Sequence, residues 1–280
     1  MTDTLLVNEP IGKKEQMDMG EYIIHHLQDS HEWNIFGYHI HLPTFPPVRF
    51  LGLELDFSIT MHVVMMWIVS VILILTFGLL FRKKRLVPTG LAAILEAVVL
   101  FIRDEIAIPN VGLKDGKKMT PLLCTMFFFI LSCNLIGLIP LFGTATGNIT
   151  VTASLAIITF FTTQIMGMVK NGIFGYFRNL VPHGIPFPLM FIIVPIEIFG
   201  LFTKPFALAM RLFANMIAGH TVIYALIGLI IAIGSVLVAP FAIVFAIFIN
   251  FLEILVAFIQ AYIFTMLSSL FIGMAMHPEH

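Results

Sequence analysis

The sequence predicts an all-α integral membrane protein with about five transmembrane helices, and three observations carry this prediction. Of the 280 residues, 59% are hydrophobic and only 11% are charged, whereas a soluble domain averages about 25% charged residues. The mean hydropathy is +1.00. Several uncharged runs are long enough to cross the roughly 30 Å core of a bilayer. These features exclude an ordinary soluble enzyme, and a net charge of -1 offers no basic field to nucleic acid.

Residues 1–58 are predicted to form an external segment ahead of the membrane domain, which spans residues 59–275. The segment is polar to mixed and acidic. No cleavable signal peptide is expected, because the first long apolar run begins only near Ile59. No metal site is expected either, because the histidines of the segment match no zinc signature. These histidines are His25, His26, His31, His39 and His41.

The first predicted span covers residues 59–81, which carry no formal charge and would form about 34 Å of helix. The loop after it holds eight of the fifteen cations. The positive-inside rule therefore places this loop in the cytoplasm and the N-terminus outside. Within the loop, residues 91–102 are apolar but too short to span, which predicts a helix on the membrane surface.

Two further spans are predicted at residues 119–140 and 149–169. A polar turn joins them, and the second span ends at Lys170 on the cytoplasmic side, in agreement with the loop charges. Cys124 and Cys133 lie in the first of these runs, nine residues apart. On a helix this spacing points them in opposite directions, so we expect two unpaired core residues.

The last two spans are predicted at residues 188–234 and 240–275, followed by a cytoplasmic tail at 276–280. As straight helices these runs would measure about 70 Å and 54 Å, roughly twice the bilayer core. Either each run contains a break, or each is one steeply tilted helix. The residues alone slightly favour a break near Pro205, because proline removes a helix hydrogen bond.

Only four formal charges occur between residues 188 and 275: Glu197, Lys204, Arg211 and Glu253. A charge at the centre of a membrane helix is costly and usually marks an ion path. Arg211 lies in the middle of its run, so we expect a functional role. Lys204 lies nearer the cytoplasmic end, where its side chain could reach water. Glu197 shares the helix face of these two cations and is expected either to line an exit path or to pair with Lys204.

An antiparallel hairpin that turns near residue 236 would bring further polar residues together. It places Arg211 opposite Gln260 at mid-depth, and His220 opposite Glu253 nearer the external side. A histidine and a carboxylate in one layer can relay protons, although a simple structural hydrogen bond is the alternative. A guanidinium never deprotonates, so Arg211 is suited to block conduction and to attract a carboxylate.

The run Leu201–His220 holds R-L-F-x-N-M-x-A-G at Arg211–Gly219 and resembles the arginine-bearing helix of the ATP synthase subunit a family. The stretch Phe251–Met266 with Gln260, and the N-terminal Glu21–His26, resemble its bacterial members as well. The resemblance covers nearly the whole chain. It implies a non-catalytic stator with no cofactor, whose last two helices form a long tilted hairpin rather than broken elements.

The family resemblance also implies partners and residue roles. The partners are a ring of c subunits, the b subunits of the peripheral stalk and the rest of the complex, in a bacterial plasma membrane. Arg211 would face the ring carboxylate with Gln260 close by, and His220 and Glu253 would line an external half-channel. Asn215 and Lys204 would support them. Proton flow would turn the ring and drive ATP synthesis, although the chain does not distinguish H+ from Na+.

Two other classes of function compete with this interpretation. A secondary ion-coupled transporter with an intramembrane Arg, Glu and His site would be expected to show paired inverted repeats. A membrane-embedded enzyme would need a nucleophile and a base, or metal ligands, at one depth. The chain contains no nucleophile elbow, P-loop, dinucleotide fingerprint or H-E-x-x-H motif.

Overall fold

A computed structural model describes most of the chain after the N-terminal segment. The described residues are 32–35, 38–43, 48–50, 53–55, 58–82, 88–139, 143–179, 187–233 and 239–278. Most of the predicted external segment, three of its histidines and the last two residues of the predicted tail therefore lie outside the described residues.

Two short hairpins precede the membrane helices. Strand β1 (Glu32–Ile35) pairs with β2 (Tyr38–His41), and β3 (Val48–Phe50) pairs with β4 (Leu53–Leu55), both antiparallel. The sequence analysis did not predict these strands. They lie before the first membrane helix, so they leave the all-α prediction for the membrane domain intact.

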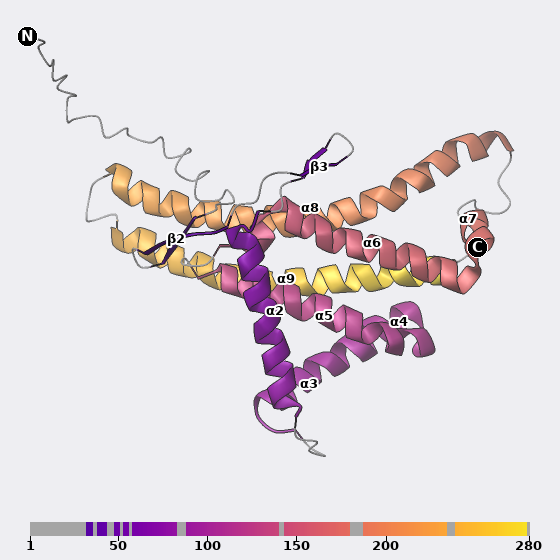
Figure 1. The fold of residues 1–280 in the computed structure, drawn as a ribbon, viewed down its shortest axis with the longest axis horizontal. Coiled ribbons are helices and arrows are strands. Elements are labelled where there is room, and N and C mark those ends of the chain that lie inside the picture. The colour runs from indigo at the N-terminus through magenta and orange to yellow at the C-terminus, as the bar shows by residue number, and fades with distance from the viewer. Residues whose placement is uncertain are drawn as a thin grey trace, which may run out of the picture.

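In the described part of the chain, five helices are long and apolar enough to cross a membrane, which agrees with the predicted number. Figure 1 shows how they are arranged. Most of their large apolar side chains remain exposed on the outer surface, as expected where lipid replaces water. The five helices are α2 (Met61–Leu80), α5 (Leu113–Gly137), α6 (Ile149–Asn171), α8 (Phe187–Ile233) and α9 (Ala239–Met276).

Helices α8 and α9 are both continuous and run antiparallel along the whole length of the molecule (Figure 1). The long hairpin implied by the family resemblance is therefore confirmed, and the break near Pro205 that the residues alone slightly favoured is wrong. Helix α8 continues through Pro195 and Pro205, as membrane helices often do because an open backbone is costly in lipid. At 47 residues, α8 measures about 70 Å and cannot cross a 30 Å core without a steep tilt.

The predicted surface helix is present as α3 (Leu91–Phe101). The chain then passes through a π-helix, η1 (Ile102–Ala107), and the single turn α4 (Ile108–Val111). Gly112 follows with φ at 95°, a backbone conformation that residues other than glycine rarely adopt. The chain then enters α5. Helix α3 lies beside the far end of α2 (Figure 1), and η1 and α4 contact α9.

The core lies where α5 and α6 pack against the hairpin. Helix α5 contacts α9, and α6 contacts both α8 and α9. Leu123 and Ile130 of α5, Leu212 of α8 and Ala261 of α9 are almost fully buried in this core. The free cysteines, Cys124 and Cys133, are buried on α5. We call the end with the α8–α9 turn the turn end, and the end with Met276 the carboxyl end.

Candidate functional site

Glu253 of α9 lies against the backbone of α8 at Gly219. A Cβ atom at Gly219 would overlap the Oε1 atom of Glu253, so only a glycine leaves room for the carboxylate. His220 is the next residue of α8, and its ring lies 6.5 Å from the ring of Tyr224. The structure thus brings the predicted acid and imidazole to one level of the hairpin, in the register expected for a turn near residue 236.

Two polar atoms at this level are buried and lack a hydrogen-bond partner among the described residues. They are His220 Nε2 and Glu253 Oε2. Buried polar groups in proteins are nearly always hydrogen-bonded, and exceptions mark ordered water or a functional group. The acid and the imidazole therefore retain free hydrogen-bonding capacity toward water inside the protein. They do not form the closed His–Glu hydrogen bond that was the structural alternative.

A small cavity extends from Glu253 toward Gln260 between α5, α8 and α9. Its volume is about 20 Å³, enough for roughly one water molecule. Gln260 is 8% exposed and lines this cavity together with Glu253. The cavity is lined by Asn134, Leu138, Leu212, Asn215, Met216, Glu253, Val256, Ala257 and Gln260.

Arg211 lies on the exposed surface of α8 and not in this cavity. Its neighbour Leu212 is buried and lines the cavity together with Gln260. Arg211 and Gln260 are therefore at one level of the hairpin, as the predicted register requires. Their side chains differ in exposure, because Arg211 is exposed and Gln260 is buried. The guanidinium is presented outward, where a partner could meet it.

Asn134 is a candidate site residue that the sequence analysis missed. It is 2% exposed in α5, and its Oδ1 accepts a 2.7 Å hydrogen bond from the hydroxyl of Thr146 in the 3-10 turn η2 (Ala145–Gly147). The signal in the sequence was a single amide inside an apolar span. Such a residue is costly in lipid and marks an interior contact, but it carries no formal charge.

A larger cavity of about 600 Å³ opens at the carboxyl end between α6, α8 and α9. Glu197 and Lys204 line it from α8, and Gln164 lines it from α6. The Nζ atom of Lys204 lies 5.8 Å from the ring centre of Phe271, a cation–π distance. Among the described residues no ion pair joins Glu197 to Lys204.

Tyr176 of the short helix α7 (Ile173–Asn179) completes the wall of this cavity. Its hydroxyl donates a 2.6 Å hydrogen bond to Oε1 of Gln164. Burial, with a smaller contribution from the negative charge of Glu197, raises the pKa of Tyr176 above its usual value. The hydroxyl therefore remains protonated and keeps the Gln164 carbonyl oriented toward it.

Comparison with known proteins places these features in a family. A family model described as ATP synthase A chain matches residues 63–273. An ATP synthase subunit a from Chloroherpeton thalassium is 51% identical over 92% of this chain and 77% of its own. An ATP synthase subunit a 2 from Chlorobium luteolum is 49% identical over 97% and 80%, and an ATP synthase subunit a from Myxococcus xanthus is 50% identical over 81% and 75%. The chain, with its Arg211 helix and its unbroken α8–α9 hairpin, belongs to the ATP synthase subunit a family.

Proposed function

We propose that the chain is the proton-translocating stator of a bacterial rotary ATP synthase. It would lie against a ring of c subunits, be held by the b subunits of the peripheral stalk, and couple proton flow to ring rotation and ATP synthesis. The observation that carries the proposal is the pair of buried polar atoms at the Glu253–His220 level of the hairpin, which have no hydrogen-bond partner among the described residues. Arg211, nine residues before His220 on α8, is exposed on the outer surface.

The entry path is proposed to begin at the turn end, on the external side of the membrane. Glu253 and His220 can each take and release a proton, and their unpartnered atoms can bind water. The cavity with Asn215 and Gln260 continues the polar route toward the level of Arg211. These residues deliver the proton to the ring; none of them acts as a catalyst on a substrate.

Arg211 is proposed to separate the entry path from the exit path. Its positive charge attracts the ionised ring carboxylate and favours release of that carboxylate's proton. A proton then crosses only when the ring turns, and each charge that crosses gains about 2.3 kcal/mol per 100 mV. An arginine suits this role, because its guanidinium does not deprotonate and offers no leak of its own.

The exit path is proposed to include the larger cavity, with the carboxyl end in the cytoplasm. Glu197 can hold a departing proton, and Lys204 keeps a positive charge at the same wall. The absence of an ion pair between them in the described part of the chain supports a solvent path over a structural pair. This topology leaves the N-terminus on the external side.

The transporter alternative receives no support from the hairpin. Transporter sites are typically built on interrupted helices in corresponding positions of two repeats. Here α8 is helical throughout Phe187–Ile233 and α9 throughout Ala239–Met276. Both helices present polar groups from a continuous backbone, which favours a fixed stator surface over a pair of moving half-helices.

The decisive experiment replaces Arg211 by alanine in the whole complex. ATP-driven proton pumping is measured in inverted vesicles, together with passive proton permeability after the catalytic head is stripped. We expect Arg211→Ala to abolish pumping and to retain or raise permeability, while the exposed Arg82→Ala pumps normally. Coupled pumping by the Arg211→Ala complex would overturn the proposal.

A further inference from the structure

The last third of α9 lies along a row of main-chain carbonyl groups. Three residues make the contacts: Ser269 and Gly273 of α9, and His277, which directly follows the end of α9. They are spaced four apart, so they lie along one side of the helix. The carbonyls belong to η1 and α4, at Ile106, Asn110 and Val111. We call these three carbonyl groups the carbonyl cradle.

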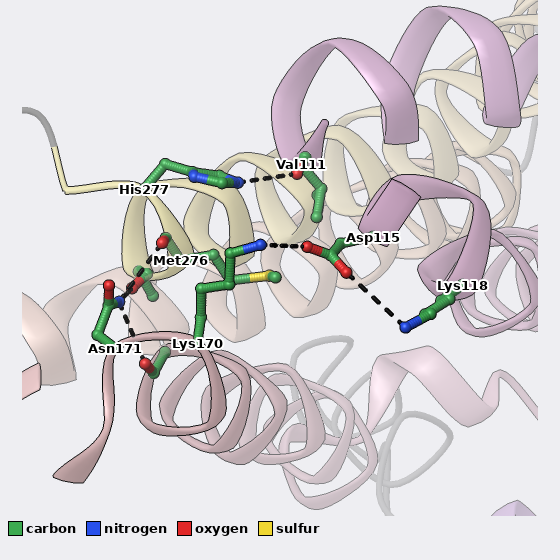
Figure 2. Close-up of polar contacts among 9 residues, drawn as sticks. Val111, Asp115, Lys118, Lys170, Asn171, Met276 and His277 are labelled. Carbon is green, nitrogen blue, oxygen red and sulfur yellow. Dashed lines mark hydrogen bonds and ion pairs between the residues drawn. The ribbon is translucent and has the colours of Figure 1, made fainter. Parts of the chain in front are cut away.

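Each of these three residues contacts the carbonyl cradle differently. The hydroxyl of Ser269 donates a buried 3.0 Å hydrogen bond to the carbonyl of Ile106. At Gly273 a Cβ atom would overlap the carbonyl oxygen of Asn110, so the two backbones touch. Nε2 of His277 lies 3.2 Å from the carbonyl oxygen of Val111 (Figure 2). A carbonyl only accepts, so the imidazole donates this bond.

The carbonyl cradle depends on irregular backbone in this segment. An α-helix bonds its internal carbonyls to its own N–H groups, but a π-helix and a helix end disturb this pairing. Ile106 lies in η1 and also accepts from the side chain of Asn110 at 2.8 Å. Val111 ends α4. The π-helix and the single turn after it thus present carbonyls to α9.

Asn171, the last residue of α6, holds the same end of α9 from the opposite side. Its side-chain nitrogen donates to the carbonyls of Ala275 at 3.0 Å and Met276 at 3.4 Å (Figure 2). These are terminal carbonyls that lack partners within their own helix. Next to it, Lys170 pairs with Asp115 at 2.7 Å and joins α6 to α5. The end of α9 is therefore fixed from two directions.

The rest of the buried face of α9 offers few directional contacts. Glu253 packs against Gly219 of α8, and Ala257 and Ala261 pack against the core without polar groups. Thr265 bonds to the carbonyl of Ala261 in its own helix, and the first hydrogen bond from this face to another helix is that of Ser268 with Thr159 of α6, at 3.2 Å and next to Ser269. Smooth apolar packing resists separation but specifies axial position and rotation weakly, whereas hydrogen bonds are directional. The position of α9 along its own axis is consequently set near its carboxyl end.

We propose that the carbonyl cradle fixes the register of α9, and that Ser269, Gly273 and His277 are positioning residues for proton translocation through Gln260. The proposal rests on the proposed function. Gln260 is nine residues from Ser269, about 14 Å along the helix. A slip of one residue would turn its side chain by about 100° and move it about 1.5 Å, more than the roughly 0.5 Å that a functional site tolerates.

The test uses Gly273→Ala in the whole complex, with Gly78→Ala as the matched control. Both replace a helical glycine by alanine, but nothing lies within 4 Å of a Cβ at Gly78. The amount of assembled subunit is measured first. ATP-driven pumping per assembled complex is then measured as a function of pH, because a displaced Gln260 alters the surroundings in which protons transfer, whereas a lower yield of complex does not.

We expect Gly273→Ala to lower pumping per complex about fivefold or more and to shift the pH of half-maximal pumping, as displaced transfer groups do. Gly78→Ala should match the wild type. Pumping that is unchanged, or lowered at an unchanged pH profile, overturns the proposal. If Gly273→Ala does not assemble, Ser269→Ala and His277→Ala decide instead: a shifted profile in either supports it, and wild-type profiles in both overturn it.

His277→Gln adds a rescue arm, because a glutamine amide can still donate to the Val111 carbonyl. It should pump closer to the wild type than His277→Ala, and equal behaviour of the two removes His277 from the proposal. The Arg211→Ala experiment distinguishes failure of the stator function from failure of the positioning role. If Arg211→Ala pumps normally, the stator function fails; if only the cradle variants behave as wild type, the positioning role alone fails.

Discussion

The carboxylate of Glu253 on α9 rests against Gly219 of α8, one residue before His220. This contact fixes which turn of α8 faces the only acid of α9, and it occurs because glycine offers no side chain at the crossing. The acid is thereby held inside the hairpin, with its Oε2 atom buried and without a partner among the described residues. A proton-accepting group is thus placed inside the hairpin, beside the small cavity that Glu253 lines.

Gly219→Ala is predicted to displace the Glu253 carboxylate and leave the helices in place. The overlapping atom is the end of a flexible side chain, so Glu253 can move while α8 and α9 remain packed. We expect proton pumping to fall by about 10-fold to 100-fold, since a displacement near 1 Å at a reacting group can cost up to about 100-fold. The melting temperature of the complex should change little. Gly200→Ala, which has open space around it on the same helix, is the control for helix propensity.

Glu253→Gln is predicted to lower pumping more than it lowers stability. The amide keeps the shape of the side chain but cannot take up or release a proton near neutral pH. Loss of a proton-transfer group typically costs on the order of 100-fold in rate. Pumping is measured against pH, with Glu96→Gln on the surface helix as the control. Pumping within twofold of the wild type by the Glu253→Gln complex would remove Glu253 from the path.

The sequence predicted which residues of the hairpin lie opposite each other better than it predicted which residues of other helices pack against them. Two long apolar runs with a turn near residue 236 determine which positions face each other, and the Gly219–Glu253 contact follows that register. Asn134 was missed because its level depends on how α5 packs against the hairpin, which no spacing within α5 specifies. Arg211 was identified by its formal charge within an apolar run, whereas the Asn134 amide carries no charge.

The wrong break at Pro205 has a different origin. Proline removes one backbone donor, which in water often ends a helix. In a membrane an open backbone is far more costly, and the chain stays helical through Pro205. The π-helix η1 also escaped prediction, since its sequence has no feature that separates it from an ordinary turn of α-helix.

The Asn134–Thr146 bond is predicted to stabilise the wall of the small cavity. Thr146→Val removes the hydroxyl that donates to Asn134 and preserves the shape of the side chain. Hydrogen bonds between membrane helices contribute about 0.6 to 1.7 kcal/mol, so a double-mutant cycle with Asn134→Leu should give a coupling energy in this range. Unfolding of the purified subunit measures it. Additive effects of the two substitutions would show that the bond contributes nothing.

Gln164→Cys is predicted to react with a membrane-impermeant maleimide, because Gln164 lines the 600 Å³ cavity. Maleimides react with thiolates, which form in water and not in lipid. Ile165→Cys is the adjacent control, since Ile165 is 53% exposed on the outer surface of α6 and does not line the cavity. The native cysteines, which are buried, are replaced by serine in both variants.

We expect labelling of Gln164→Cys in inverted vesicles and not in right-side-out vesicles, as a cytoplasmic carboxyl end requires. Labelling only in right-side-out vesicles would reverse the proposed topology, and equal labelling of the two cysteines would remove the cavity from the proposed exit path.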